Sequence, residues 1–432
     1  MTEHVDLNGT AYAHVWLTDP IAVLYEIAKR HSGVDVWMTF ADASFLIVQS
    51  QETAKTVLRH RSEEFDKYFG VHRSFFGHSR LTANGEDWRL LRDHSQPYLS
   101  KIKPAEAAVK AVGYYKTAAD RIIAEADATR KVVIDDAIDL AAASTVSVLV
   151  LGIDFAQLGP KTIRDIRNVF ACTSVLNWRP LDEAAPEDAG LIRKARRSYA
   201  GLRHDLLALS ETDADGSSLF SRLARSECDV LDFADEVSTL LVAGYETTAS
   251  AIGWSLSMLA RVPALQDRLR TALGGLTLSE DVNIDVLLDN EEILAVSREA
   301  LRMFPPVPIL GRIANRNTVV GGDSVPSGQR VLVSTIGLHQ NKDVFAKPAA
   351  FRFDRFPNGR IPESFRESYK PFGDGQRICP GARFALAEIA VALAVIVERV
   401  RLEPSGEPVP PFYWGASMRR KMGQTLVVQA LH

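Results

Sequence analysis

Apolar residues recur at helical spacing through most of the middle of the chain and at strand spacing only in short runs. Residues 104–262 read mainly as helices, which polar loops near residues 180–186 and 212–218 interrupt. Residues 382–400 are strongly apolar and predict another helix. A chain with this pattern is expected to be mainly helical.

Short β-rich runs add small sheets to this helical pattern. Residues 34–40 and 44–49 flank a short turn and predict a hairpin, and Ser50 is the expected N-cap of the helix that follows. Residues 318–320 and 330–334 predict two further strands around turns that contain glycine and proline. The predicted fold class is therefore mainly α with small β-sheets (α+β).

The composition is that of an ordinary globular protein. Of the 432 residues, 46% are hydrophobic and 24% charged, which excludes a disordered or collagen-like chain. The chain has 50 Lys and Arg against 54 Asp and Glu, and the resulting net charge of −4 gives no global basis for nucleic-acid binding. Three cysteines exclude a disulfide scaffold, and the length alone suggests roughly two or three domains.

The start of the chain, MTEHVDLNGT, has neither the basic nor the apolar region of a signal peptide. No segment reaches the roughly 20 apolar residues that a membrane span needs. We therefore expect a soluble, cytoplasmic protein with no membrane insertion.

The most specific chemical feature is the glycine-rich loop FGDGQRICPG, residues 372–381, which precedes the last apolar helix. Cys379 lies where the N–H groups and the positive dipole end of that helix favour a thiolate. The loop glycines allow the backbone to approach the sulfur or a flat cofactor closely, and Arg377 can reach an anionic group. The other cysteines, Cys172 and Cys228, are expected to be small buried hydrophobes.

This loop matches in full the F-x-x-G-x-R-x-C-x-G signature of the haem-thiolate monooxygenases, so the chain resembles the cytochrome P450 family. The resemblance implies haem b (iron protoporphyrin IX) as cofactor, with Cys379 as the thiolate ligand and metal-binding residue. It also implies that Phe372 packs beside the loop and that Arg377 pairs with a haem propionate. A nucleotide-binding loop is the weaker alternative, because no strand precedes Gly373 and a third glycine is missing.

A polar interruption, AGYETT, lies within the helix predicted for residues 231–262. Ala243 and Gly244 are small enough to let a planar group lie close to the helix backbone. A threonine hydroxyl can bond the carbonyl four residues back and open a local groove. By itself, an acid beside an alcohol is also consistent with a satisfied polar patch between packed elements.

The same hexapeptide matches the P450 signature A-G-x-[DE]-T-T at every position. The resemblance implies that Thr247 stabilises the bound oxygen species and that Glu246 helps to deliver protons. Thr248 would have a supporting role.

Glu299 and Arg302 share one face of a helix that is predicted to begin at Asp289, with Glu292 as its capping-box partner. Taken alone, they read as a surface ion pair. They also match the family's E-x-x-R motif, which implies a structural triad with Arg355. The segment around Arg355 departs from the usual P-E-R-F at its first two positions.

Further basic residues resemble the groups that hold haem carboxylates in the family. Trp88 and Arg92 match a W-x-x-x-R pattern on one helix, although such a pattern alone usually marks an ordinary helix surface. Arg312 corresponds to a strand arginine that also binds a propionate. His339 is interpreted as a structural histidine rather than a contributor to the site.

Family position also indicates a substrate pocket, although each of its residues is equally consistent with plain core. The expected lining residues are Phe75, Phe76, Val307, Ile309 and Leu310. An aromatic and aliphatic lining suits an apolar substrate such as a terpenoid, steroid or fatty-acid-like molecule. The wider set of candidates comprises Tyr68, Phe69, His72, Arg73, His78, Arg80 and residues 414–418, of which the basic members could hold a carboxylate.

The resemblance implies a bacterial-type monooxygenase in one domain, residues 1–432, without a fused reductase or a membrane anchor. Motifs from Trp88 to Gly381 converge on one cofactor, which replaces the expectation of several domains. Electrons would come from a ferredoxin or flavodoxin with its reductase, docked near Arg89, Lys101 and Lys103. Two alternatives stay open: a peroxygenase that uses hydrogen peroxide, and a haem-binding sensor or scaffold without catalysis.

Overall fold

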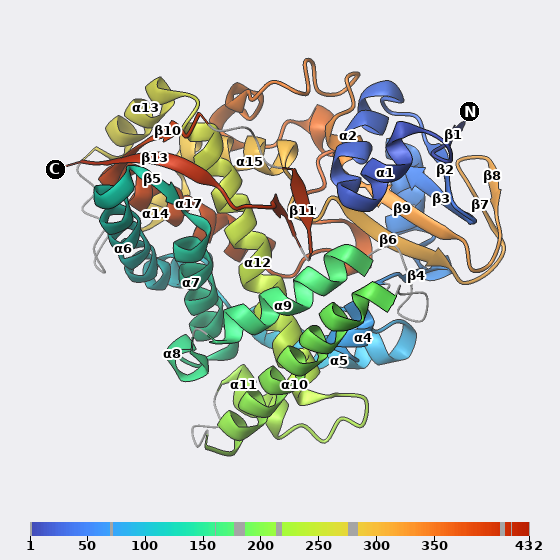
Figure 1. Cartoon of the computed structure of the whole chain (residues 1–432), viewed down its shortest axis with the longest axis horizontal. Helices are drawn as coiled ribbons and strands as arrows, with labels where there is room; N and C mark the ends of the chain where they lie inside the picture. The colour runs from blue at the N-terminus through green and yellow to red at the C-terminus, as the bar shows by residue number, and fades with distance from the viewer. Residues whose placement is uncertain are drawn as a thin grey trace.

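A computed structural model of the chain separates a helical part from a part built around a sheet (Figure 1). The structure describes residues 2–69, 72–159, 161–176, 186–212, 218–274, 284–406, 411–415 and 417–431. Most of the polar loops predicted near residues 180–186 and 212–218 lie outside this part of the chain. The predicted class, mainly α with small sheets, is confirmed.

Helix α12 (Phe233–Leu259) runs through the middle of the helical part (Figure 1). Asp232 caps its start, because the Asp232 carboxylate accepts a hydrogen bond from the Asp235 N–H at 2.9 Å. Almost every later side chain of α12 is buried, so the helix is surrounded by protein rather than amphipathic. In the main hydrophobic core it packs against α7 (Asp135–Val146) and α17 (Ala382–Arg399), and α6 (Pro104–Thr129) packs in turn against both of these helices.

The remaining helices surround this core. Those before α12 are α1 (Ala11–Thr18), α2 (Pro20–Arg30), α3 (Gln51–Lys55), α4 (Arg73–Phe76), α5 (Gly85–Leu99), α8 (Phe155–Leu158), α9 (Lys161–Leu176), α10 (Ala189–Thr212) and α11 (Leu219–Ala224). Those after it are α13 (Pro263–Leu273), α14 (Ile284–Leu288), α15 (Glu291–Met303) and α16 (Thr335–His339). No helix among the described residues is long and apolar enough to cross a membrane.

The largest sheet has six strands in the order β1-β2-β3-β9-β6-β4. Its strands are β1 (Glu3–Asp6), β2 (Val36–Phe40), β3 (Ala43–Val48), β4 (Phe65–Lys67), β6 (Ile309–Ala314) and β9 (Arg330–Ser334). The predicted hairpin is the antiparallel pair β2–β3, and β3 continues into a parallel pairing with β9. At the edge of the sheet, β4 pairs with β6 so that Lys67 lies opposite Arg312. Two cations distant in sequence are thereby placed side by side.

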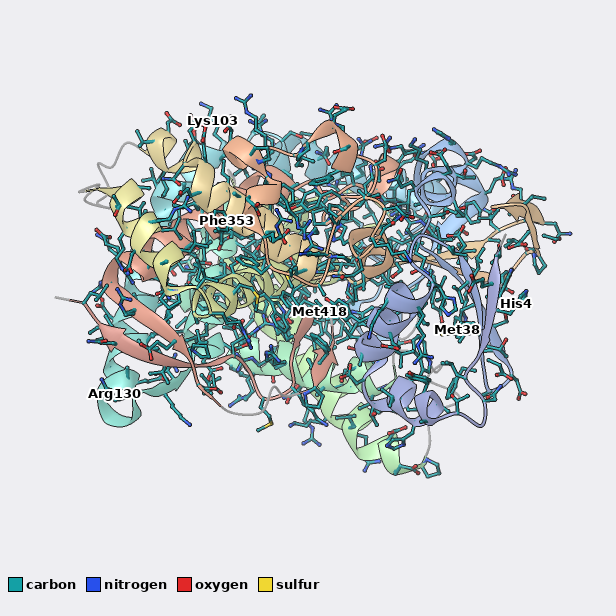
Figure 2. The ribbon with its side chains drawn as sticks, turned by 90° about the horizontal axis from the view of Figure 1, so that it is seen from above. His4, Met38, Lys103, Arg130, Phe353 and Met418 are labelled. Atoms are coloured by element: carbon teal, nitrogen blue, oxygen red, sulfur yellow. The ribbon has the colours of Figure 1, made fainter. Side chains whose placement is uncertain are left out.

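Three smaller sheets complete the β-structure. They are β5 (Lys131–Val133) with β10 (Val400–Pro404) and β13 (Thr425–Ala430), β7 (Thr318–Val320) with β8 (Asp323–Val325), and β11 (Phe412–Trp414) with β12 (Met418–Arg420). Met418 lies near the centre of the molecule (Figure 2). Its side chain is buried, and its carbonyl accepts hydrogen bonds from Ser250 Oγ at 2.7 Å and Trp254 Nε1 at 2.9 Å on α12. The C-terminal hairpin is therefore fixed to the central helix.

Of two predicted helix starts, one is confirmed and one is wrong. Ser50 is the N-cap residue of α3, as predicted, although its hydroxyl bonds Asp35 Oδ2 and Thr53 Oγ1, both at 2.8 Å, instead of a backbone N–H of the helix. Helix α15 begins at Glu291 rather than Asp289, because the Asn290 side chain accepts the hydrogen bond from the Ile293 N–H. An asparagine is as good an N-cap as an aspartate, so the local sequence did not distinguish the two positions.

Candidate functional site

A cavity of about 370 Å³ lies between α12, the loop before α17, strand β6 and the segment that follows β4. It collects most of the residues predicted for the site. Those that line it are Phe76, Trp88, Ala243, Gly244, Thr247, Val307, Ile309, Leu310, Arg312, Phe372, Arg377 and Cys379.

The loop that carries Cys379 is shaped by short-range hydrogen bonds. The Cys379 N–H donates to the Phe372 carbonyl at 2.9 Å, and the Asp374 carboxylate accepts from the Gly375 N–H at 2.7 Å. Gly375 has φ +66°, and a Cβ there would come within 1.9 Å of the Leu58 carbonyl oxygen, so only glycine fits. These hydrogen bonds and the glycine together fix the backbone conformation of the loop that leads to Cys379.

Cys379 lies in the wall of this cavity and is exposed to the space inside it. A ligand in the cavity can therefore reach the thiol, although the cavity itself is enclosed by protein. Burial raises the pKa of the Cys379 thiol, whereas the Gly381 N–H and the Lys67 ammonium oppose that rise because both favour the thiolate. Among the described residues, no group of three His, Cys, Asp or Glu side chains could hold a metal ion. The cysteine is thus a single ligand that needs a cofactor to complete the coordination of a metal.

Basic side chains gather beside the cysteine loop. The Arg377 guanidinium lies 4.0 Å from the centre of the Trp88 ring and donates to Ala83 O at 2.7 Å and Asn84 Oδ1 at 3.1 Å. Arg92 also lies near the Trp88 ring, at 5.7 Å, but it is not part of the cavity wall formed by the described residues. Of the predicted W-x-x-x-R pair, Trp88 therefore lines the cavity and Arg92 does not.

Four cations of the cavity wall have no acidic partner within ion-pair distance among the described residues: Lys67, Arg312 and Arg377, and also Arg80, whose guanidinium bonds the neutral Ser95 and Gln96 side chains. Burial lowers the pKa of Arg312 to about 10 and that of Arg377 to about 9, and it holds the pKa of Lys67 well below its usual value. Unpaired buried charges are costly. A group with two carboxylates beside an accessible thiol would remove that cost, and the two propionates of haem fit this description.

The sequence pattern missed Lys67. It lies on β4 and carries no motif, and only its pairing opposite Arg312 on β6 brings it to the site. A lone lysine at the end of a short strand gives no signal of such a role.

The two threonines of α12 bond their own helix backbone. Thr247 Oγ1 donates to the Ala243 carbonyl and Thr248 Oγ1 donates to the Gly244 carbonyl, both at 2.8 Å. Thr247 lines the cavity, so its hydroxyl oxygen remains available as an acceptor there. A Cβ on Gly244 would lie 2.2 Å from Val146 Cγ2, so the space that this glycine leaves is used for packing against α7 rather than for a planar group alone.

Glu246 is not part of the described cavity wall. Its side chain is buried and bound on both oxygens, with Ser417 Oγ and Arg419 Nη2 each at 2.8 Å. Arg419 also pairs with Asp139 on α7 at 2.7 Å. Burial raises the pKa of Glu246, and the Arg419 charge opposes this rise. Thr247 therefore faces the cavity, whereas Glu246 faces a buried cluster of polar side chains. No sequence motif indicated the members of this cluster, which are Ser417, Arg419 and Asp139.

Glu299, Arg302 and Arg355 form a buried triad instead of a surface ion pair. Glu299 accepts from Arg302 Nε at 2.7 Å and from Arg355 Nε at 3.2 Å, and the side chains of Glu299 and Arg302 are 0% exposed. His339 is also fully buried. Its Nδ1 lies 3.0 Å from the Arg302 carbonyl, and its Nε2 accepts from the Lys370 N–H at 2.9 Å. Burial lowers the pKa of His339 to about 3, so the histidine stays neutral and ties the triad to the start of the cysteine loop.

The lining of the predicted substrate pocket needs one correction. Phe75 is buried in the main core and does not line the cavity, whereas its neighbour Phe76 does. Successive side chains on a helix point about 100° apart, so only one of two adjacent phenylalanines on α4 faces the cavity. Of the wider candidates, those that line it are Tyr68, Phe69, His72, Arg80, Trp414 and Gly415. Residue 416 lies outside the described residues, and Arg73, His78, Ser417 and Met418 are not in the described wall.

Comparison with known proteins gives the family. The Cytochrome P450 family model matches residues 14–427. The chain is 38% identical over 174 residues to "Cyclooctatin synthase" of Streptomyces melanosporofaciens, covering 39% of this chain and 37% of that protein. It is 33% identical over 198 residues to "Cyclooctat-9-en-7-ol 5-monooxygenase" of the same organism, covering 44% and 43%. It is 34% identical over 209 residues to "Taurochenodeoxycholic 6 alpha-hydroxylase" of Sus scrofa, covering 48% and 41%.

The matched segments span about two fifths of the length of these relatives. The family model, by contrast, covers nearly the whole chain, and the family implies a haem cofactor. The accessible thiol and the unpaired cations of the cavity agree with such a group. The chain belongs to the cytochrome P450 family.

Proposed function

We propose that the chain is a haem-thiolate monooxygenase for an apolar small molecule. One oxygen atom of dioxygen enters a C–H bond of the substrate, and the other leaves as water after two electrons and two protons are supplied. The observation that carries this proposal is the single cavity that holds the Cys379 thiol, unpaired cations and the Thr247 hydroxyl together. The proposal treats residues 1–432 as one catalytic domain.

The cofactor in this proposal is haem b. Cys379 would bind its iron, Phe372 would pack beside it, and Ala243 and Gly244 would lie against its face. Arg312, Arg377 and Lys67 would pair with its propionates, supported by Trp88 and by Arg92 from outside the wall. When bound, a haem with a thiolate ligand supplies dioxygen activation.

The chain's own contribution includes control of protons. Thr247 faces the cavity and can pass a proton through its hydroxyl, while Glu246 is the nearest acid in the motif. Because Glu246 is bound to Arg419 and Ser417, it can deliver a proton to the cavity only after it leaves these partners. We propose Thr247 as the group that contacts the reacting oxygen and Glu246 as the proton source behind it.

Electrons would come from a ferredoxin or flavodoxin with its reductase. The predicted docking residues do not form a purely basic patch, because Arg89 has Glu86 at 3.3 Å and Lys103 has Glu106 at 3.5 Å. Lys103 points outward at the edge of the molecule (Figure 2). Charge reversal at Arg89, Lys101 and Lys103 together should slow reduction by the partner and weaken its salt dependence. An unchanged rate and salt dependence would remove this surface from the proposal.

The experiment for the activity uses isotopically labelled dioxygen with a surrogate redox system and an apolar substrate. We expect the label to appear in the product and in stoichiometric water. Faster turnover with hydrogen peroxide than with the redox system would instead indicate a peroxygenase. Tight haem binding without turnover under either condition would indicate a sensor or scaffold.

A further inference from the structure

Glu236 is a buried carboxyl on the cavity-facing side of α12 that the proposed mechanism does not use. It precedes Ala243 by seven residues and Thr247 by eleven, and all three line the cavity. These spacings are close to whole numbers of helical turns, so the three residues share one face. The helical rise puts Glu236 roughly 10 Å from Ala243 and roughly 16 Å from Thr247 along the axis.

Only half of this carboxyl group is satisfied. Glu236 Oε2 accepts from the backbone N–H of Arg80 at 2.6 Å, while Oε1 has no hydrogen-bond partner among the described residues. The side chain is 0% exposed. Leaving a buried acceptor without a partner is unfavourable, so such a group in a cavity wall is suited to bind a donor on a ligand.

Two donors in the cavity wall beside Glu236, Arg80 and Thr239, are already engaged with other partners. The Arg80 guanidinium donates to Ser95 Oγ at 2.9 Å and to Gln96 on α5 rather than to the carboxylate. Thr239, one turn along the same helix face, donates its hydroxyl to Ser79 Oγ at 3.0 Å. Beyond Thr239, the face continues with Leu240 and Ala243. A polar anchor is therefore followed by an apolar wall that leads towards Thr247.

We propose that Glu236 binds a hydroxyl group of the substrate, so that the enzyme oxidises elongated apolar alcohols at a carbon roughly 10–16 Å from that hydroxyl. This inference rests on the proposed function, because it takes the level of Ala243 and Thr247 as the reaction site. A carboxylate ligand would be repelled by Glu236. An ammonium would have to lose its hydration shell in an apolar cavity where Arg80 is also near.

A hydroxyl also fits both forms of the acid. Burial raises the pKa of Glu236 to about 7, opposed by the Arg80 N–H and by the charges of Arg80 and His94, while Asp235 adds to the rise. A hydroxyl can donate to the carboxylate or accept from the protonated acid. An ether can only accept, so above this pKa an alcohol and its methyl ether should be clearly distinguished.

The test compares decan-1-ol with decyl methyl ether on the haem-loaded protein near pH 8, by calorimetry and by the haem spectral shift. Decanoic acid and decylamine serve as charged probes. We expect the wild type to bind the alcohol about tenfold more tightly than the ether, the size of one hydrogen bond to a charged group. In Glu236→Gln, the amide oxygen keeps the Arg80 N–H and its NH₂ faces the cavity. That donor serves alcohol and ether alike, so the preference should fall to near unity.

Glu388→Gln is the matched control. Glu388 is a fully buried carboxyl with one oxygen that has no hydrogen-bond partner among the described residues, but it lies outside the cavity wall, so its variant should keep the tenfold preference. The inference is overturned if Glu236→Gln keeps the preference, if the wild type does not bind decan-1-ol, or if either charged probe binds more tightly than the alcohol. A protein without the spectrum of thiolate ligation would contradict the proposed function itself, which separates the two failures.

Discussion

At the scale of single residues, the charged side chains around the cavity differ in whether they have a partner. Arg312 is buried and Arg377 is half-buried, and neither has an acid at ion-pair distance among the described residues. Glu246 is the reverse case, since Arg419 and Ser417 bind both of its oxygens. The first arrangement favours an anionic ligand, and the second holds an acid back from the cavity.

Arg312→Leu should lower the affinity for haem by about tenfold or more, because a charge-assisted hydrogen bond to a carboxylate contributes roughly 1.5–3 kcal/mol. Haem titration of the protein measures this change. Arg316→Leu is the control: it removes an exposed arginine just after the end of β6 and should leave the affinity for haem unchanged. Equal affinities for the wild type and Arg312→Leu would contradict a role in carboxylate binding.

Arg419→Met should destabilise the fold by about 3–5 kcal/mol, because it leaves the buried Glu246 carboxylate without its cation. In a Glu246→Gln background the same substitution should cost clearly less. Urea unfolding of the two single variants and the double variant measures this coupling. If the losses in unfolding free energy of the two single variants simply add in the double variant, the ion pair between Arg419 and Glu246 does not contribute to stability.

At the scale of elements, α12 is held by close contacts with its neighbours. Gly244→Ala would place a Cβ 2.2 Å from Val146 Cγ2 on α7, which should cost about 1–3 kcal/mol even though alanine is the better helix former. Gly253→Ala is the control in the same helix, because its Cβ would lie 3.4 Å from Gln424 Cγ. In thermal unfolding, the melting temperature of Gly244→Ala should be lower than that of Gly253→Ala. Adding Val146→Ala to Gly244→Ala should restore the lost stability. The opposite ranking would contradict the packing account.

Helices α6 and α17 are joined by a hydrogen bond from Tyr115 Oη to Glu388 Oε1 at 2.9 Å. Burial raises the pKa of Glu388 to about 8 from its ordinary 4.5. Between these values the folded state holds a proton that the unfolded state has lost. The contribution of Glu388 is therefore fully present below about pH 4.5 and is lost as the pH rises towards 8, at about 1.4 kcal/mol per pH unit.

Denaturant unfolding from pH 5 to pH 8 tests this sign. The stability of the wild type relative to Glu388→Gln should fall as the pH rises. A constant difference across the series, or one that grows in favour of the wild type, would contradict a neutral Glu388 in the folded protein.

At the scale of the whole molecule, contiguous features were predictable and contacts between distant segments were not. The cysteine loop and the AGYETT segment each depend on neighbouring residues, so the sequence indicated both. Lys67 reaches the cavity only through the pairing of β4 with β6, and Arg419 reaches Glu246 only when the C-terminal hairpin folds onto α12. Such pairings depend on topology, which residue spacing does not contain.

Smaller differences also follow from geometry. Phe75 and Phe76 are chemically alike, and only the orientation of α4 decides which of them lines the cavity. Glu299 and Arg302 read as a surface pair by spacing, although the face of α15 that they share is buried. The main α class, the β2–β3 hairpin and the last helix were correct, because hydrophobic periodicity reports them directly. The extent of the domain stays a prediction.

The central claim is that Cys379 binds haem iron as a thiolate. The most direct measurement is the absorption spectrum of the reduced carbonyl complex of the haem-loaded protein, with Cys172→Ser as the control for a cysteine buried away from the cavity. We predict the red-shifted Soret band of thiolate ligation in the wild type and in Cys172→Ser, and its loss in Cys379→Ala. A wild type without this band, or a Cys379→Ala variant that keeps it, would contradict the account.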